Sequence, residues 1–260
     1  MNQFIVLLQK EMTESIRNGK WIWLPIVLII IGISQPLTSY YMPQILEMAG
    51  NIPDGATIDI PTPSGEEVLM GTLSQFGMIG TLLFVLAVMS VIAQERQNGS
   101  LTLVMVRPIS ALQYIGSKYV AQLVLLLVAF FLSYGFTWYY TNLLFSDVAW
   151  TVIISSFIVY SLWIVFVVAV TIFTGTVVKN NGGIAGASIL FLGAISLLTS
   201  LLPRFMEWSP GNLRAAASMV LLEGVWSKDV WMVVSCTVAL SVLFFALAVW
   251  RFKRFESYNG

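Results

Sequence analysis

The residues best placed to act on another molecule lie in one polar connection between two apolar runs. It reads Glu95-Arg96-Gln97-Asn98-Gly99-Ser100, continues through residues 101–106, which are apolar except for Thr102, and ends in Arg107-Pro108. Because Pro108 disfavours helical geometry at Arg107, a short helix is predicted over residues 100–106. An apolar helix outside a bilayer needs a surface to cover it, either the ends of the chain's own spans or another protein. The connection is therefore a candidate docking element.

Catalytic chemistry is poorly represented in this composition. The chain has no histidine, which excludes zinc-peptidase motifs, histidine-based triads and histidine-ligated haem. Cys236 is the single cysteine, so no intrachain disulfide or cysteine metal cluster is expected. A G-x-x-x-x-G-K-[S/T] phosphate loop is also absent, so ATP hydrolysis would have to come from a partner. We expect no enzyme activity, cofactor or metal in this chain itself.

Two further polar segments are weaker candidates. The segment from Pro43 to Glu67 carries five acidic residues and no basic one, which favours a solvated acidic loop over a cation site. Residues 202–229 are broken by Pro203 and Pro210, and residues 212–224 could form a helix too short to span. We interpret this region as a surface or re-entrant hairpin on the outer side. Glu223 would line an exit path or, as an interfacial carboxylate, point to water.

Six apolar runs must position these segments. Each run holds at least 21 residues without a charged side chain, and about 20 apolar residues suffice to cross a bilayer as a helix. The composition agrees, with 58% hydrophobic and 10% charged residues and a mean hydropathy of +0.85. We predict an all-α membrane protein, with residues 1–20 as an interfacial helix and 21–260 as one six-helix domain. The predicted spans are 22–42, 71–93, 119–143, 151–176, 182–202 and 230–250.

Basic residues predict the orientation. With the amino terminus inside, the inner segments hold ten Lys and Arg residues and the outer ones hold only Arg204, Arg214 and Lys228. The positive-inside rule then places both termini in the cytoplasm. The span interiors contain no Asp, Glu, Lys or Arg, which disfavours a proton-coupled pump but leaves open sodium sites built from carbonyls and hydroxyls.

Local patterns add three expectations. Residues 1–17 place their apolar side chains on one arc, with Lys10, Glu14 and Arg17 opposite and directed toward the cytoplasm. Ser110 and Gln113 match a capping box that would start the third helix before its span. Gly182 and Gly186 have the spacing of a close helix contact, and the absence of ionic residues within the spans suggests no buried ion pairs to hold the helices.

Taken in order, these residues resemble the membrane-spanning permease subunits of type 2 ATP-binding cassette (ABC) exporters. Lys10, Glu11, Glu14 and Arg17 are similar to that family's elbow helix. More specific are Glu95-Arg96-x-x-Gly99-Ser100-Leu101, Arg107-Pro108-Ile109-Ser110 and Gly116-x-Lys118, which resemble its coupling helix and the foot of its third helix. The broken segment from Pro203 through Pro210 to Glu223 resembles its re-entrant helices near the exit.

The resemblance implies partners and a cargo. Two permease subunits, identical or homologous, would pair in a bacterial cell membrane above two ATPase subunits that bind ATP and magnesium. The coupling helix, including Leu101, Leu103 and Val104, would sit in an ATPase groove. The short connection at 179–183 departs from the family and suggests one substantial ATPase contact per subunit.

Fold alone does not select a substrate. Uncharged spans favour an apolar or amphiphilic peptide, antibiotic or lipid-like cargo. The alternatives are a non-transporting scaffold or sensor, and a channel or sodium-coupled carrier. Membrane lipids are expected contacts and nucleic acid is not.

Overall fold

All regular secondary structure is helical in the residues that the computed structural model describes, which are 3–48, 62–99, 101 and 109–256. The π-helix η1 interrupts the second long helix, and the 3-10 helix η2 precedes α10. The helices are α1 (Gln3–Arg17), α2 (Lys20–Met48), α3 (Gly65–Gln75), η1 (Phe76–Gly80), α4 (Thr81–Val88), α5 (Ser90–Gln97), α7 (Ala111–Leu144), α8 (Trp150–Val177), α9 (Asn181–Leu201), η2 (Pro210–Asn212), α10 (Leu213–Glu223) and α11 (Lys228–Glu256).

Six helical segments within the described residues are long and apolar enough to cross a membrane, which confirms the predicted number. They are Lys20–Leu46, Gly65–Gln97, Ala111–Leu144, Trp150–Val177, Asn181–Leu201 and Lys228–Arg254. The second combines α3, η1, α4 and α5. Each contains its predicted span except the fifth, whose helix ends at Leu201, one residue early.

The first outer connection is shorter than predicted. The helix α2 continues through Pro36 and Pro43 to Met48. At the other side of the connection, α3 begins at Gly65 because Ser64 and Glu67 form a capping box. Acidic residues of this segment that fall within 49–61 lie outside the described part of the chain.

The third helix begins where its sequence predicts. The backbone N–H of Gln113 donates to Ser110 Oγ at 3.2 Å, and the backbone N–H of Ser110 donates to Gln113 Oε1 at 3.4 Å. This reciprocal pair satisfies two donors at the start of α7. The extension before the predicted span carries Tyr114 and Lys118 into the bundle.

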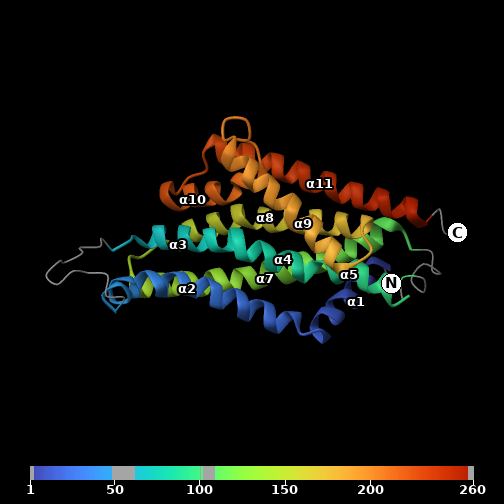
Figure 1. Cartoon of the computed structure of the whole chain (residues 1–260), viewed down its shortest axis with the longest axis horizontal. Helices are drawn as coiled ribbons and strands as arrows, with labels where there is room; N and C mark the ends of the chain where they lie inside the picture. Colours follow the sequence, from blue (N-terminus) through green and yellow to red (C-terminus); the bar gives the residue numbers. More distant parts are fainter. Residues whose placement is uncertain (1–2, 49–61, 100, 102–108, 257–260) are drawn as a thin grey trace.

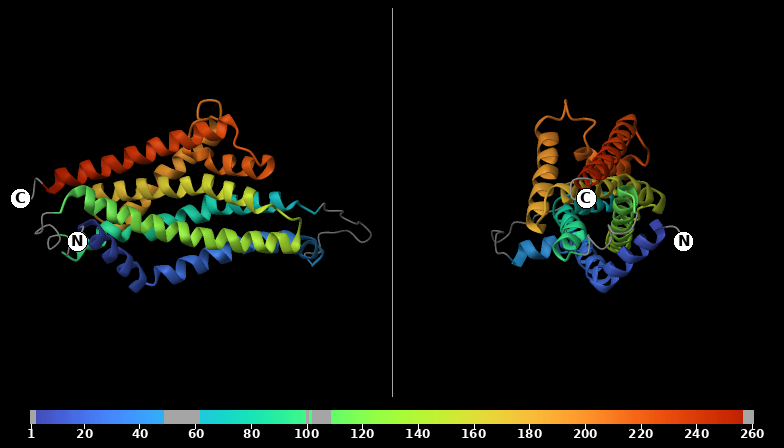
Figure 2. Two further views of the ribbon diagram at one scale, coloured as in Figure 1. Left: turned by 180° about the vertical axis from the view of Figure 1, so that it is seen from behind. Right: turned by 90° about the vertical axis from the view of Figure 1, so that its right-hand side faces the viewer.

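The long helices run roughly along one axis, so the bundle has two ends (Figures 1 and 2). One end, called the α1 end below, gathers α1, the end of α5, the start of α7 and the end of α11. The helix α10 lies toward the other end, against α3 and α8. The central helix α8 packs against α4, α7, α9, α10 and α11.

Aromatic rings fill the centre of the bundle. The buried ring of Phe130 contacts Phe76 and Tyr160 at centroid distances of 5.3 and 5.0 Å, and it stacks on Tyr134 and Phe157. Such pairs add about 0.5–1.5 kcal/mol each beyond the apolar area that they bury. They join η1, α7 and α8.

A close helix approach lies at Gly32 rather than at the predicted glycines. A Cβ atom added at Gly32 of α2 would lie 2.4 Å from Thr137 Oγ1 and 2.8 Å from Ser133 Oγ on α7. The Ser133 hydroxyl also donates to Leu28 O at 2.5 Å. In contrast, no atom lies within 4 Å of a Cβ added at Gly182 or Gly186. Those two glycines therefore make no close helix contact inside the described chain.

We expect the same substitution at two glycines to have different effects. Gly186→Leu should leave the thermal midpoint of the purified chain unchanged, because the added side chain meets open space. Gly32→Leu should destabilise it by about 1–3 kcal/mol through overpacking against α7. Thermal unfolding in detergent, followed by circular dichroism, measures both. Equal midpoints for the two variants would contradict the placement of the close contact.

Candidate functional site: an ion cluster at the α1 end

Five charged or phenolic side chains from α1, α5 and α7 form an ion cluster at the α1 end. Lys118 Nζ lies 2.8 Å from Glu11 Oε1 and 3.0 Å from Glu95 Oε1. These side chains are only 1%, 6% and 5% exposed. Lys10 adds a second ammonium group on Glu95. The cluster, defined as Lys10, Glu11, Glu95, Tyr114 and Lys118, therefore ties the three helices together.

Tyr114 extends the cluster to the last helix. Its hydroxyl donates to Glu95 Oε2 at 2.5 Å, and its ring stacks on Phe252 of α11 with centroids 4.7 Å apart. Lys118 also donates to the carbonyl of Val91 at 3.0 Å. A buried carboxylate is costly unless it is paired and hydrogen-bonded, and Glu95 meets both conditions. The expectation of no buried ion pairs was wrong.

The helix α1 turns toward the bundle a face that the sequence did not predict. Leu7, Glu11 and Ser15, spaced four residues apart, face the bundle and are buried. Ile5 and Ile16, which belong to the predicted apolar arc, are exposed. The sequence interpretation directed Lys10 and Glu14 to the cytoplasm; the Lys10 side chain is 40% exposed and also pairs with Glu95, a contact that the sequence did not predict. Glu14 is half-buried, with an oxygen 3.9 Å from Lys10 Nζ.

The pKa of Lys10 is raised by this environment. Partial burial lowers the pKa, but the hydrogen bond and negative charge of Glu95, together with Glu11 and Glu14, outweigh that effect. The pKa of the Lys10 ammonium group therefore lies above its usual value of 10.5. Its contribution to stability is fully present below pH 10.5 and is lost as the pH rises through the higher pKa of the folded state.

Three carboxylates of this region, on Glu11, Glu14 and Glu95, come within 4.8 Å of one another. Lys10 and Lys118 supply the compensating positive charges through direct contacts. Carboxylates neutralised in this way form an ion-pair network. The cluster is suited to mechanical connection of helices.

Arg96 fastens a different element. Its Nη1 donates to the carbonyl of Gly175 at 2.8 Å and of Val178 at 3.3 Å, and its Nη2 donates to Thr176 O at 3.1 Å. The last carbonyls of a helix lack intrahelical partners and carry partial negative charge, so a guanidinium group stabilises them. Arg96 therefore caps the carboxyl end of α8.

Gly99 ends α5. Its φ of +71° lies in the left-handed region, which glycine adopts without a Cβ penalty. Three residues of the Glu95-Arg96-x-x-Gly99 pattern thus have roles inside this chain: ion pairing, capping of α8 and helix termination. The sequence assigned them only to an external partner.

The predicted coupling segment comprises residues 95–108, and its part after Gly99 lies mostly outside the described residues. This applies to Ser100, Leu103, Val104, Arg107 and Pro108. Leu101 is helical and partly buried against the chain's own core. The chain's own core therefore covers part of the apolar Leu101 side chain.

The outer candidates are remote from the ion cluster. Residues Leu213–Glu223 form the short helix that was predicted, which ends at Gly224 with φ +70°. Pro203 and Glu223 are exposed, whereas Pro210 is buried at the start of η2. The exposed state of Glu223 agrees with a carboxylate that points to water. Sequence reasoning did not identify Lys118 as buried, although it belongs to the Gly116-x-Lys118 pattern.

The comparisons with known proteins support a location in a membrane. A family model described as "Protein of unknown function (DUF2705)" matches residues 56–258. The chain is 38% identical over 258 residues to the "Uncharacterized transmembrane protein YxlG" of Bacillus subtilis (strain 168). The matched region covers 99% of this chain and 100% of that protein. Together with the six apolar helices, this similarity identifies the chain as a multi-pass membrane protein.

Proposed function

Because the chain belongs to the DUF2705 family, whose description assigns no activity, we propose a function from its own geometry: it is the permease subunit of an ATP-driven ABC exporter. The observation that carries the proposal is the ion cluster at the foot of the coupling segment. Glu95 begins that segment and is bonded to α1 and α7. A force applied to the segment would therefore move both helices, and α11 through Tyr114.

Arg96 supports the same mechanism. It connects the base of the coupling segment to the end of α8, next to the short connection that begins at Lys179. One docking contact would then act on both cytoplasmic connections. This offers a physical reason why a single substantial ATPase contact would suffice despite the short connection at 179–183.

The proposed assembly contains two permease subunits and two ATPase subunits, with ATP and magnesium bound by the ATPases. We place the α1 end and both termini in the cytoplasm, and the protein in the cell membrane. The α9 face with Gly182 and Gly186 is open and would accept a second permease, identical or homologous. Near the exit, α10 would serve as part of a re-entrant hairpin. The cargo would be apolar or amphiphilic, because the bundle exposes mostly apolar side chains along its spans.

Removal of the docking surface tests this function. In the Leu101→Asp, Val104→Asp double variant, two apolar contacts worth roughly 1.5–3 kcal/mol each would be lost, so we expect ATPase binding to weaken by about 10-fold or more. The variant should no longer co-purify an ATPase or support ATP-dependent export. The measurement is quantitative pull-down from native membranes, followed by transport in reconstituted vesicles.

Two controls separate docking from folding. Leu112→Asp places a carboxylate at an exposed site at the foot of α7 and should retain ATPase binding. Val104→Asp alone leaves Leu101, which packs partly on the chain's own core, unchanged. Normal assembly of the double variant, or recovery of no nucleotide-binding subunit with the wild-type chain, would refute the proposal and favour a scaffold, sensor or ion carrier.

A further inference from the structure

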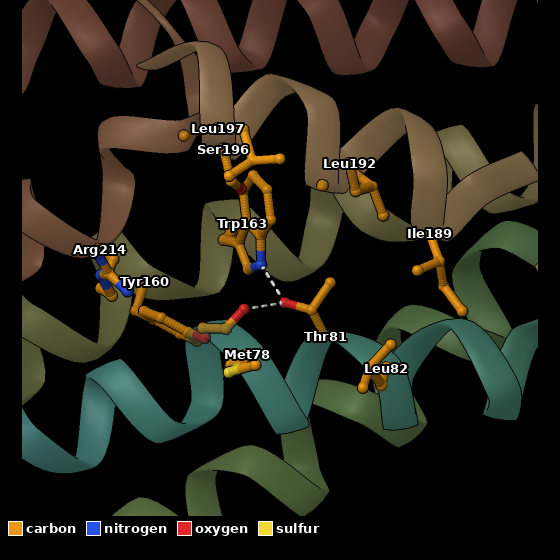
Figure 3. Close-up of a pocket in the computed structure, with 13 residues that line it drawn as sticks. Met78, Thr81, Leu82, Tyr160, Trp163, Ile189, Leu192, Ser196, Leu197 and Arg214 are labelled. Atoms are coloured by element: carbon orange, nitrogen blue, oxygen red, sulfur yellow. Dashed lines mark hydrogen bonds between the residues drawn. The ribbon is translucent and has the colours of Figure 1, made fainter. Parts of the chain in front are cut away.

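A cavity of about 440 Å³ lies between η1, α4, α8, α9 and the start of α10 (Figure 3). Sites for small molecules in proteins commonly measure about 300–1,000 Å³, so this volume is sufficient for a ligand. Most of its wall is apolar, with Leu82 on α4 and Ile189 and Leu192 on α9. The cavity is separate from the ion cluster at the α1 end.

One polar group in the wall lacks a partner. Tyr160 is 0% exposed, and its hydroxyl makes no hydrogen bond to any described residue. Other polar groups nearby are satisfied: Trp163 Nε1 donates to Thr81 Oγ1 at 2.8 Å, and that hydroxyl donates to Gly77 O at 2.9 Å (Figure 3). Buried polar groups are rarely left unpaired in proteins. The Tyr160 hydroxyl therefore indicates a missing hydrogen-bonding partner within the cavity.

A positive charge lies on the same side of the cavity as Tyr160. The side chain of Arg214 extends from α10 beside Tyr160 (Figure 3). The Arg214 side chain lies over Gly77 in the π-helix η1. A Cβ atom added at Gly77 would be 3.1 Å from Arg214 Cδ. Across the described part of the chain, no carboxylate pairs with this guanidinium group. A guanidinium group matches a carboxylate or phosphate through paired hydrogen bonds.

The rim of the cavity faces apolar surroundings. Met78 and Leu197 are 75% and 64% exposed, and both belong to membrane-spanning helices. In a bilayer, these side chains contact acyl chains. An apolar cavity provides too few hydrogen bonds to hold ordered water throughout, so an acyl chain is a better occupant of its apolar part.

We propose that this cavity binds an anionic amphiphile with an acidic head group and an acyl chain. The head group accepts hydrogen bonds from Arg214 and the Tyr160 hydroxyl, and the acyl chain lies against α9 between Ile189 and Leu197. This site goes beyond export, because it requires neither an ATPase nor a cargo. Its occupation would hold α10 against α4 and α8.

Photolabelling of the full chain in vesicles tests the site. The probe is phosphatidylglycerol with a diazirine on one acyl chain, and the zwitterionic comparison is the matching phosphatidylcholine. We expect the anionic probe to label cavity residues and the zwitterionic probe to label them about 10-fold less. Arg214→Gln should reduce anionic labelling about 10-fold, since it removes a charge-assisted hydrogen bond.

Matched variants make the result specific. Arg204→Gln removes an exposed arginine outside the cavity and should label like wild type. Gly193→Leu projects into the cavity, where no atom lies within 4 Å of its Cβ, and should abolish labelling without unfolding the chain. Thermal midpoints verify that both variants are folded.

Three outcomes would overturn the proposal: equal labelling by the two lipids, equal labelling of the Arg214→Gln and Arg204→Gln variants, or complete competition by inorganic phosphate, which would indicate an anion site without an acyl chain. The experiment contains no ATPase subunit. Its failure would therefore leave the proposed export function standing, and failure of the export function would leave this site standing.

Discussion

Lys118→Met is expected to destabilise the chain by about 3–5 kcal/mol, because it leaves buried carboxylates without their shared ammonium group. Lys118 is fully buried and contacts the side chains of Glu11 and Glu95, which are only 6% and 5% exposed. Lys10 remains on Glu95 and lies 3.5 Å from Glu11, but this longer contact only partly replaces the lost 2.8 Å contact between Lys118 and Glu11. The thermal midpoint in detergent should fall by about 10 °C.

The charge-balanced double variant is the decisive comparison. Adding Glu11→Gln to Lys118→Met removes one negative charge with the positive one, so we expect it to recover more than half of the lost stability. Lys179→Met removes an exposed lysine from the second connection at the same end and should have little effect. Equal destabilisation by Lys118→Met and Lys179→Met would show that the buried cluster does not hold α1 to the bundle.

Arg96→Met is expected to cost about 2–4 kcal/mol, because hydrogen bonds from a charged donor contribute about 1.5–3 kcal/mol and are not additive. Its three bonds to the last carbonyls of α8 would be lost together. We also expect the amides of residues 171–177 to exchange with deuterium faster, since the end of α8 would fray. Thermal unfolding and hydrogen–deuterium exchange measure the two effects separately.

Arg96→Lys distinguishes geometry from charge. An ammonium group keeps the positive charge but lacks the planar fork that reaches several carbonyls, so we expect an intermediate loss. Arg17→Met, at the exposed end of α1, is the matched removal of an arginine. If Arg96→Met and Arg17→Met gave the same exchange in residues 171–177, the capping role of Arg96 would be excluded.

Lys118→Met and Arg96→Met both bear on function through the proposed coupling segment between α5 and α7. Glu95 and Arg96 are neighbours at the foot of the proposed coupling segment, yet they hold different helices. Loss of Lys118 would loosen α1 and α7 from that foot, whereas loss of Arg96 would loosen α8. If the proposed export mechanism holds, both variants should retain ATPase binding but couple ATP hydrolysis to transport less efficiently.

The sequence by itself determined the number of apolar helices long enough to span, the approximate position of each and the start of α7. These features depend on local physics. About 20 consecutive apolar residues suffice to cross a bilayer, and Ser110 and Gln113 satisfy donors within one helical turn. The short helix at residues 213–223 was also predictable, because Pro203, Pro210 and Gly211 interrupt the apolar pattern around it.

Only the tertiary structure decided which polar residues face inward. Lys118 pairs with Glu11 across 107 positions of sequence, and Lys10 pairs with Glu95 across 85. A helical pattern read alone places all charges on the solvent side, because it contains no information about a distant partner that compensates burial. For the same reason, the face of α1 that meets the bundle was not predicted.

The close helix contact and the cavity were likewise decided by packing. Gly182 and Gly186 have the right spacing for a contact, but Gly32 meets Ser133 and Thr137 because α2 and α7 are neighbours in space. Tyr160, Trp163 and Arg214 are ordinary residues in the sequence. They share one cavity only because the π-turn at Phe76–Gly80, α8 and α10 converge there, a convergence set by long-range packing rather than by local pattern.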